Sequence, residues 1–255
     1  MNDKVNITTI IIVMLILTGS YFNFTSLYYL IPVVLTYVII NAVGSSRIQL
    51  NYFFPSYCNA TTTKKEIALT FDDGPHPVIT PKLIELLDSY NTPATFFCTG
   101  KNAVANPKIV TTIINKGHLI GNHSYGHSRF FDLFSSKNMQ KEILDTNEVI
   151  TTITGKTPRL FRPPYGVTNP MLSKALIKTN MVSVGWSLRS YDTVKSSKKV
   201  MAKLTDDTKA GDIVLFHDTN PNVITIIEDY LFWLQKNDFK IVSLTSLLNI
   251  PAYED

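Results

Sequence analysis

Residues 66–75 read Glu-Ile-Ala-Leu-Thr-Phe-Asp-Asp-Gly-Pro, an apolar run that stops at two carboxylates and a turn. The segment Ile67–Phe71 is typical of a buried strand. Asp72 and Asp73 follow it directly, and the Gly-Pro pair then forces the chain to turn. Two adjacent carboxylates at the end of a strand cannot both point into an apolar core. Taken alone, this stretch is compatible with a solvated turn as well as with part of a site.

Outward from this stretch, short apolar strands alternate with amphipathic helices. Further strands are expected at Ala94–Thr99, His118–Gly121, Phe161, Met181–Val184, Asp212–Phe216 and Ile241–Leu244. Helices are expected at Pro81–Ser89 (with Thr80 as N-cap), Pro107–Lys116, Asn138–Ile153 (ended by Gly155), Pro170–Thr179, Val200–Thr208 and Val223–Asn237. Repeated βα units predict one α/β domain at residues 64–255, a parallel sheet or barrel with helices outside.

Composition excludes several classes of protein. The chain has 255 residues, which suit one domain and an appendage, and a formal net charge of only +4. The basic residues form no stripe, so no nucleic-acid partner is expected. Two cysteines, Cys58 and Cys98, are too few for a disulfide-built scaffold or a multi-cysteine metal site. A disulfide between these two stays open for a protein outside the cytoplasm.

The amino-terminal segment differs from the rest of the chain. No Asp, Glu, Lys or Arg occurs from Val5 to Ser46, and two apolar runs, Ile7–Phe24 and Leu27–Val43, flank the polar Thr25-Ser26. Each run is near the lower limit of about 17–25 residues for a membrane-spanning helix. Residues 1–46 are therefore predicted to form a membrane-anchoring helical hairpin, and 47–63 a linker. A signal peptide cleaved near Ser20 is the alternative.

Other polar clusters also follow predicted strands. They are His123 and His127 in His-Ser-Tyr-Gly-His, residues 162–166 (Arg-Pro-Pro-Tyr-Gly), Asp192, and His217 in Leu-Phe-His-Asp. Two histidines four apart can bind one metal ion, although they could equally be surface residues. Likewise, the proline pair could be a rigid loop and the last histidine a structural one. Because ligands bind at the carboxyl ends of parallel strands, the combination predicts a single site there.

These motifs, taken in order, resemble the polysaccharide deacetylase family. That family has the NodB-homology domain and is carbohydrate esterase family 4. The similarity runs from about residue 66 to 248 and rests on Thr-Phe-Asp-Asp-Gly-Pro, His-Ser-x-x-His, Arg-Pro-Pro-Tyr-Gly and Leu-Phe-His-Asp. It implies a distorted (β/α) barrel that removes N-acetyl, or sometimes O-acetyl, groups from sugars with the help of a metal ion.

The resemblance implies roles for the charged residues of the site. Asp73, His123 and His127 would bind the metal, most often zinc, with Asp72 as general base and His217 as general acid. These roles agree with the chemistry of amide hydrolysis. A metal with an open position lowers the pKa of bound water from about 15.7 towards about 7. The amine cannot leave as an anion, so an acid must protonate it.

The resemblance also implies positioning roles. Arg162 would orient Asp72, the backbone N–H of Tyr165 would donate to the developing oxyanion, and Asp192 would tune His217. Two adjacent carboxylates can play different parts only if their surroundings differ, and metal ligation of one with an arginine partner for the other would provide that difference.

The sequence departs from the family pattern at one motif. Where many members carry Asp-x-x-Asp-Trp, this chain has Arg189 in place of the first aspartate and Thr193 in place of the tryptophan. A substrate-lining aromatic residue is therefore missing, and the substrate preference transfers less readily than the chemistry. Trp186 is expected to be a core residue rather than a sugar-binding one. His76 and His118 are expected to be structural.

The predicted function is removal of N-acetyl groups from an N-acetylated envelope glycan by a membrane-anchored, metal-dependent hydrolase. One alternative is a deacylase of a lipid-linked sugar, and another is a non-catalytic glycan-binding domain. Arg47, Lys64 and Lys65 after the second apolar run would place the domain in the cytoplasm by the positive-inside rule. A polymer outside the cell requires the opposite, and an extracytoplasmic catalytic domain is the preferred prediction.

Overall fold

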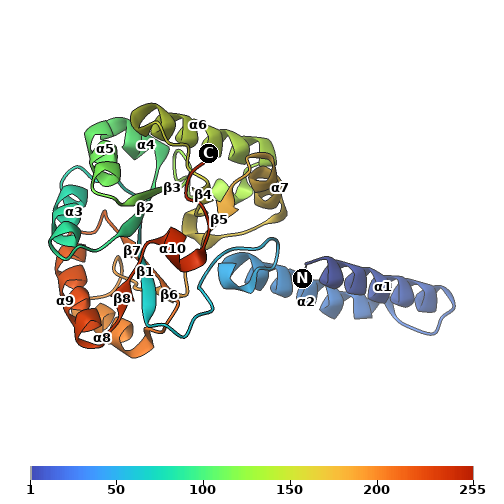
Figure 1. Cartoon of the computed structure of the whole chain (residues 1–255). Coiled ribbons are helices and arrows are strands. Elements are labelled where there is room, and N and C mark those ends of the chain that lie inside the picture. Colours follow the sequence, from blue (N-terminus) through green and yellow to red (C-terminus); the bar gives the residue numbers. More distant parts are fainter. Residues whose placement is uncertain (1, 255) are drawn as a thin grey trace.

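A curved sheet of parallel strands forms the centre of the molecule, in a computed structural model that describes residues 2–254 (Figure 1). Its strand order is β5-β4-β3-β2-β1-β7-β6, and β8 pairs with the beginning of β1. The strands are β1 Glu66–Asp72, β2 Ala94–Cys98, β3 Leu119–Asn122, β4 Leu160–Phe161, β5 Val182–Ser183, β6 Leu188–Arg189, β7 Ile213–His217 and β8 Lys240–Ile241. The predicted parallel (β/α) architecture is confirmed, as a half-barrel.

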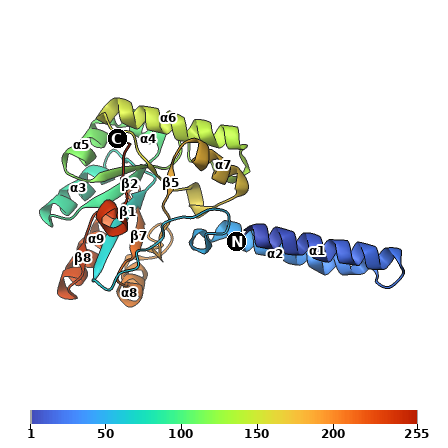
Figure 2. The ribbon, with the colours of Figure 1, turned by 45° about the vertical axis from the view of Figure 1, so that its right-hand side comes forward.

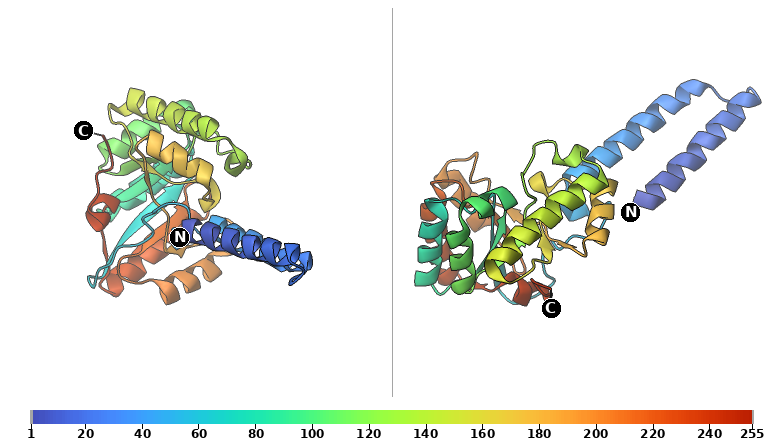
Figure 3. Two further views of the ribbon diagram at one scale, coloured as in Figure 1. Left: turned by 90° about the vertical axis from the view of Figure 1, so that its right-hand side faces the viewer. Right: turned by 90° about the horizontal axis from the view of Figure 1, so that it is seen from above.

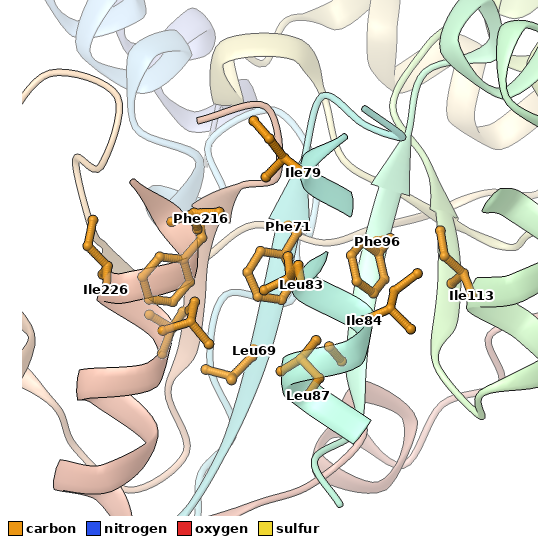
Figure 4. Packing of buried hydrophobic residues seen from close by; sticks show 14 of the residues in the cluster. Leu69, Phe71, Ile79, Leu83, Ile84, Leu87, Phe96, Ile113, Phe216 and Ile226 are labelled. Atoms are coloured by element: carbon orange, nitrogen blue, oxygen red, sulfur yellow. The ribbon is translucent and has the colours of Figure 1, made fainter. Parts of the chain in front are cut away.

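Helices cover the convex side of the sheet (Figure 1). They are α3 Ile79–Ser89, α4 Gly100–Ala105, α5 Pro107–Asn115, α6 Ser136–Thr154, α7 Pro170–Lys178, α8 Ser197–Asp207 and α9 Val223–Lys236. Apolar residues of the strands and helices interlock between these two layers, as Figure 4 shows for Phe71, Phe96 and Phe216 with Leu83 and Ile226. The short α10 (Leu244–Leu248) instead packs its first residue within the barrel.

The alternation of β1 decides which side chains reach the interior. Leu69 and Phe71 belong to the cluster under the outer helices, whereas Ala68 belongs to the cluster inside the barrel. Because successive side chains of a strand point to opposite faces, Asp72 lies on the inner side, like Ala68. His217 of β7 is paired in register with Asp72 and therefore lies on the same side.

Residues 47–63 lie along the domain and bridge the open side of the half-barrel. Tyr57 forms a parallel bridge with Val184, just after β5, and Asn59 an antiparallel bridge with Asp212, just before β7. Ile48 is buried beside Trp186. The segment predicted as a linker is thus in contact with the domain over much of its length.

The two apolar runs form an antiparallel helical hairpin that projects away from the domain (Figures 1–3). It consists of α1 (Asn2–Tyr21) and α2 (Leu30–Ser46), joined through the 3₁₀ turn Leu27–Tyr29. Both helices are long and apolar enough to cross a membrane, and almost none of their residues is buried inside the protein. Such exposure would be unfavourable in water and is expected for helices that contact lipid.

Some local predictions were wrong. Thr80 is not an N-cap, because α3 begins at Ile79, two residues before the predicted start at Pro81. The ring Nδ1 of His76 accepts hydrogen bonds from the N–H groups of Val78 and Ile79, and the Thr80 hydroxyl binds Asp218 instead. Leu244 begins α10 rather than ending the last strand. The hydroxyl of Thr80 is thus engaged by a residue 138 positions away, which no local pattern indicates.

Three elements were not predicted from the sequence, because they are too short for a periodic pattern: α4, α10 and the two-residue strand β6. The cysteines do not pair: Cys58 and Cys98 are free and buried in different apolar clusters.

Candidate active site

Three predicted metal ligands meet at the carboxyl end of the sheet. Asp73 follows β1, while His123 and His127 lie in the loop after β3, and their ligand atoms all lie within 4.8 Å of one another. Asp73 Oδ1 is 3.4 Å from His123 Nε2 and 3.3 Å from His127 Nε2. The Nδ1 atom of His123 is 2.7 Å from the carbonyl oxygen of Arg162. Donation by Nδ1–H to that carbonyl leaves the Nε2 lone pair free for a metal ion.

The charges around Asp73, His123 and His127 favour the binding of a cation. Burial alone would raise the pKa of Asp73, but the imidazoles of His123 and His127 lower it below its usual value, so the group is a carboxylate. Burial alone would lower the pKa of His123, yet the charges of Asp72 and Asp73 raise it. Burial and the neighbouring His123 lower the pKa of His127, which keeps it neutral as a ligand must be. The donor set therefore fits a divalent metal.

The histidine loop is held by side chains that the sequence analysis missed. Asn122, the last residue of β3, accepts a hydrogen bond from the N–H of Ser124 at 2.9 Å. Glu142 of α6 accepts from the N–H groups of Tyr125 and Gly126 at 3.0 and 2.8 Å. Glu142 lies 15 residues beyond His127, so no local signal pointed to it. On α4, the side-chain amide of Asn102 donates to the carbonyl oxygen of Asp73 at 2.7 Å.

Asp72 is buried and has a fixed partner for one of its oxygens. Arg162 Nη1 donates to Asp72 Oδ1 at 2.8 Å and also to the Thr70 hydroxyl at 2.8 Å. The rest of the guanidinium donates to the carbonyl oxygens of Val184 and Gly185, so Arg162 is held from several sides. The other oxygen, Asp72 Oδ2, is 3.8 Å from His123 Nε2. One carboxylate oxygen is thus anchored while the other lies beside the metal ligands.

Asp192 and His217 form a second pair at the same edge. His217 Nδ1 is 2.9 Å from Asp192 Oδ1, and Ser190 Oγ donates to the same oxygen at 2.8 Å. Burial alone would lower the pKa of His217, but the hydrogen bond and charge of Asp192 outweigh it and raise that pKa. Because Nδ1 is engaged, Nε2 is the ring nitrogen with which His217 can serve a substrate.

The turn at 163–166 depends on a glycine. Tyr165 is exposed by 53%, has a positive φ of 59°, and packs its ring edge-to-face on His127. A Cβ on Gly166 would lie 2.3 Å from the Trp186 ring, so only glycine fits. Trp186 is buried and supports this turn from below, as expected for a core residue.

Several non-glycine residues in the loops of the site have a left-handed backbone. Asp73, Ser124, His127, Tyr165 and Tyr191 all have φ between 46° and 77°. Non-glycine residues rarely adopt this region, which costs of order 1–3 kcal/mol each. Such strain persists only where surrounding contacts impose it, and it is typical of functional sites.

Arg189, which departs from the family pattern, lies beside the site without an ion pair among the described residues 2–254. Its guanidinium carbon is 5.8 Å from the Trp186 ring centroid and 5.0 Å from that of Tyr191. It therefore stacks between aromatic rings in place of the aspartate that many members carry.

Asp218 is a buried carboxyl that the sequence analysis did not assign. The Thr80 hydroxyl donates to Asp218 Oδ2 at 2.5 Å, and burial raises the pKa of Asp218 to about 7. A Cβ on Gly74 would lie 2.1 Å from the same oxygen. Asp218 thus packs directly under the turn that follows Asp73.

Comparison with known proteins agrees with the motifs. Residues 59–184 match the polysaccharide deacetylase family. A peptidoglycan-N-acetylglucosamine deacetylase of Bacillus cereus is 36% identical over 157 residues, which cover 61% of this chain and 57% of the relative. The chain thus spans little more than half of that relative. A second such deacetylase of Bacillus cereus is 32% identical over 191 residues, covering 72% of this chain and 89% of the relative.

A solved structure shows the same fold. It is a peptidoglycan N-acetylglucosamine deacetylase bound to a hydroxamate-type benzamide, with a TM-score of 0.73 and 29% identity. The match covers 78% of this chain and 95% of that structure. The motifs, the half-barrel and these similarities lead to one conclusion: this chain belongs to the polysaccharide deacetylase family.

Proposed function

We propose that this chain is a metal-dependent hydrolase that removes N-acetyl groups from an N-acetylated glycan of the cell envelope. The observation that carries the proposal is the placement of the metal trio (Asp73, His123, His127) in one site with Asp72 and His217. A ligand set, a buried carboxylate and a carboxylate-supported histidine are the parts that amide hydrolysis requires. The similarity to peptidoglycan deacetylases supports the substrate class.

The metal trio would hold zinc through Asp73 Oδ1 and the Nε2 atoms of His123 and His127. Three protein ligands with a position left open are typical of catalytic zinc. When bound, the ion would polarise the substrate carbonyl and lower the pKa of a water molecule.

The other residues would move and hold protons. Asp72 Oδ2, the oxygen not bonded to Arg162, would take the proton of the attacking water. His217 Nε2 would donate a proton to the leaving amine, while Asp192 holds its Nδ1. The backbone N–H of Tyr165 would donate to the oxygen that becomes negative, and loss of one such donor typically costs about 100-fold or more in rate.

The Asp192→Asn variant tests the role of His217 by pH. His217 must be protonated to donate, and its protonated fraction falls as the pH rises through its pKa. Because Asp192 raises that pKa, its replacement should lower it and move the alkaline limb of the rate profile to lower pH. The measurement is the pH dependence of kcat in both proteins. An alkaline limb at the same pH in both would contradict the assignment of His217 as the acid.

We also propose that α1 and α2 anchor the chain in a membrane, with the domain outside the cytoplasm. A hairpin that crosses twice leaves its two ends on one side, and Asn2 indeed lies beside Tyr52, near the base of the domain. An envelope polymer is accessible only from outside, which supports this orientation over the few basic residues after α2.

The direct test is acetate release by the full chain in detergent. N-acetylglucosamine oligomers and peptidoglycan would be supplied as substrates, with added zinc or with a chelator. We expect release that the chelator abolishes. Bound metal without release from either substrate would overturn the substrate assignment, and a protein that neither binds metal nor releases acetate would favour a glycan-binding domain.

A further inference from the structure

The end of the second apolar helix is joined directly to the active-site edge of the domain. The N–H of Thr168 donates to the carbonyl oxygen of Ser45 at 3.0 Å, and the Ser45 hydroxyl donates to the carbonyl oxygen of Thr168 at 2.7 Å. Thr168 is buried and follows Tyr165 of the active site by three residues. Since successive Cα atoms are about 3.8 Å apart, the Cα atoms of Thr168 and Tyr165 are separated by at most about 11 Å.

The residues after the helix keep this junction rigid. The Tyr52 ring packs against Gly44, where an added Cβ would lie 2.4 Å from the ring. Ile48 is buried beside Trp186, and the Gln49 side chain donates to the Trp186 carbonyl oxygen at 3.0 Å. No free spacer therefore lies between α2 and the part of the domain that supports Tyr165.

The length of the helix places this junction at the membrane surface. The apolar segment Leu27–Ser46 has 20 residues. At a rise of about 1.5 Å per residue this length matches the hydrocarbon core, about 30 Å thick. Ser45 then lies at the edge of the hydrocarbon, and the headgroup layer extends only about 5–8 Å farther on each side. The active-site edge beside Ser45 thus lies close to the headgroup layer, since the Cα of Tyr165 is within about 11 Å of that of Thr168.

Exposed apolar side chains surround the junction. Phe130, Leu133 and Met171, which we call the apolar rim, are exposed by 53%, 75% and 39%. The rim is joined to the helix end by Asn169, whose side chain donates to the carbonyl oxygen of Asp132 at 2.7 Å. Such a group of large apolar side chains is unfavourable in water and is suited to a lipid interface.

Cationic side chains accompany the rim. The Arg129 guanidinium lies 5.2 Å from the Phe130 ring centroid, and exposed Lys174 follows Met171 by three residues on the same face of α7. Aromatic residues beside arginine or lysine are favoured at the membrane interface, where the cations meet lipid phosphates.

We propose that the apolar rim rests on the bilayer and that the substrate is an N-acetylated amino sugar linked through phosphate to a membrane lipid. The inference rests on the proposed function and specifies its substrate. A site held rigidly close to the headgroups can reach a sugar carried on a lipid, and of an envelope polymer it can reach only the part that lies beside the membrane. Arg129 and Lys174 beside the rim outnumber the exposed carboxylate of Asp132 and suit the phosphate of the linkage.

The test compares two substrates with the full chain reconstituted in vesicles of zwitterionic and anionic phospholipid. One is a water-soluble N-acetylglucosamine oligomer, and the other is N-acetylglucosamine attached to a polyprenyl chain through pyrophosphate. We expect a higher kcat/KM for the lipid-linked sugar. In Leu133→Glu, the ratio of lipid-linked to soluble turnover should fall at least about tenfold, because a charge replaces a side chain buried in the interface. Phe232→Glu, at an equally apolar and exposed position on α9, should leave the ratio unchanged.

An insertion of six Gly and Ser residues provides a second test that spares the rim. Placed after Ser46, it would separate the helix end from the domain and should lower the same ratio, because the site is no longer held close to the headgroups. Placed after Thr63, beyond the docked residues 45–60, the same insertion should leave the ratio of lipid-linked to soluble turnover unchanged. Turnover of the soluble oligomer at an equal or higher kcat/KM than the lipid-linked sugar would overturn this inference alone. Absence of turnover of both substrates would contradict the proposed function and this inference with it.

Discussion

Asp72→Asn is expected to lower turnover by about 10²–10⁴-fold, the usual contribution of a general base, while the protein keeps its metal. Asparagine has nearly the same shape, and its Oδ1 can still accept the hydrogen bond of Arg162 Nη1. The nitrogen that replaces Oδ2 cannot take a proton from water. Single-turnover rates and metal content, measured on the same preparation, would show the two properties separately.

The variant should also be less stable. Arg162 is fully buried, and Asp72 is its counter-charge. Removing one partner of a buried ion pair costs about 3–5 kcal/mol, so a lower Tm is expected even though the hydrogen bond survives. Asp229→Asn, on the exposed side of α9, is the matched control and should change neither rate nor Tm. A folded, metal-loaded Asp72→Asn protein with the rate of the unaltered chain would exclude Asp72 as the base.

The second large effect is expected on metal binding, in His123→Ala and Asp73→Ala. Each change removes one of three ligand atoms that lie within 4.8 Å of one another. Loss of an outer partner of a ligand already costs about 10–100-fold in metal affinity, so loss of a ligand itself should cost more. Zinc content after dialysis and Kd from competition with a chromophoric chelator are the measurements, and turnover should fall in parallel.

His76→Ala is the control for these ligand variants. His76 lies four residues from Asp72, but its ring caps the start of α3 and is outside the metal trio. The His76→Ala variant should lose about 1 kcal/mol in stability, as the loss of a helix cap does, and its zinc content should be unchanged. Equal zinc content in His123→Ala and in the unaltered chain would contradict the ligand assignment.

Local patterns in the sequence were sufficient to predict the parallel α/β architecture of the domain. Apolar runs such as Ile67–Phe71 ended in charged residues and were separated by helical periodicity, which predicted parallel strands with their polar ends on one edge. The structure confirms that arrangement and brings Asp72, Asp73, His123 and His217 together there. Strand alternation and the parallel direction suffice for this, because both are properties of short segments.

The residues that hold the loops of the site in place could not be predicted from local sequence patterns. Glu142 holds the histidine loop from α6, and Asn102 holds the Asp73 carbonyl from a helix too short to show a period. The left-handed backbone of Asp73 and His127 is held by such contacts, because this region is unfavourable for a residue with a Cβ. Nothing near these residues in the sequence indicates which distant side chain will meet them.

The sequence by itself predicted the candidate site residues, most of the strands and helices along the chain, and the two apolar helices. Only the tertiary structure decided that residues 45–60 dock on the barrel, that Trp186 supports the turn at 163–166, and that α2 ends beside the active-site edge. The physical reason is that strand and helix signals arise from neighbours in the chain. Docking arises instead from buried surface and hydrogen bonds between segments more than 100 residues apart, such as Ser45 and Thr168.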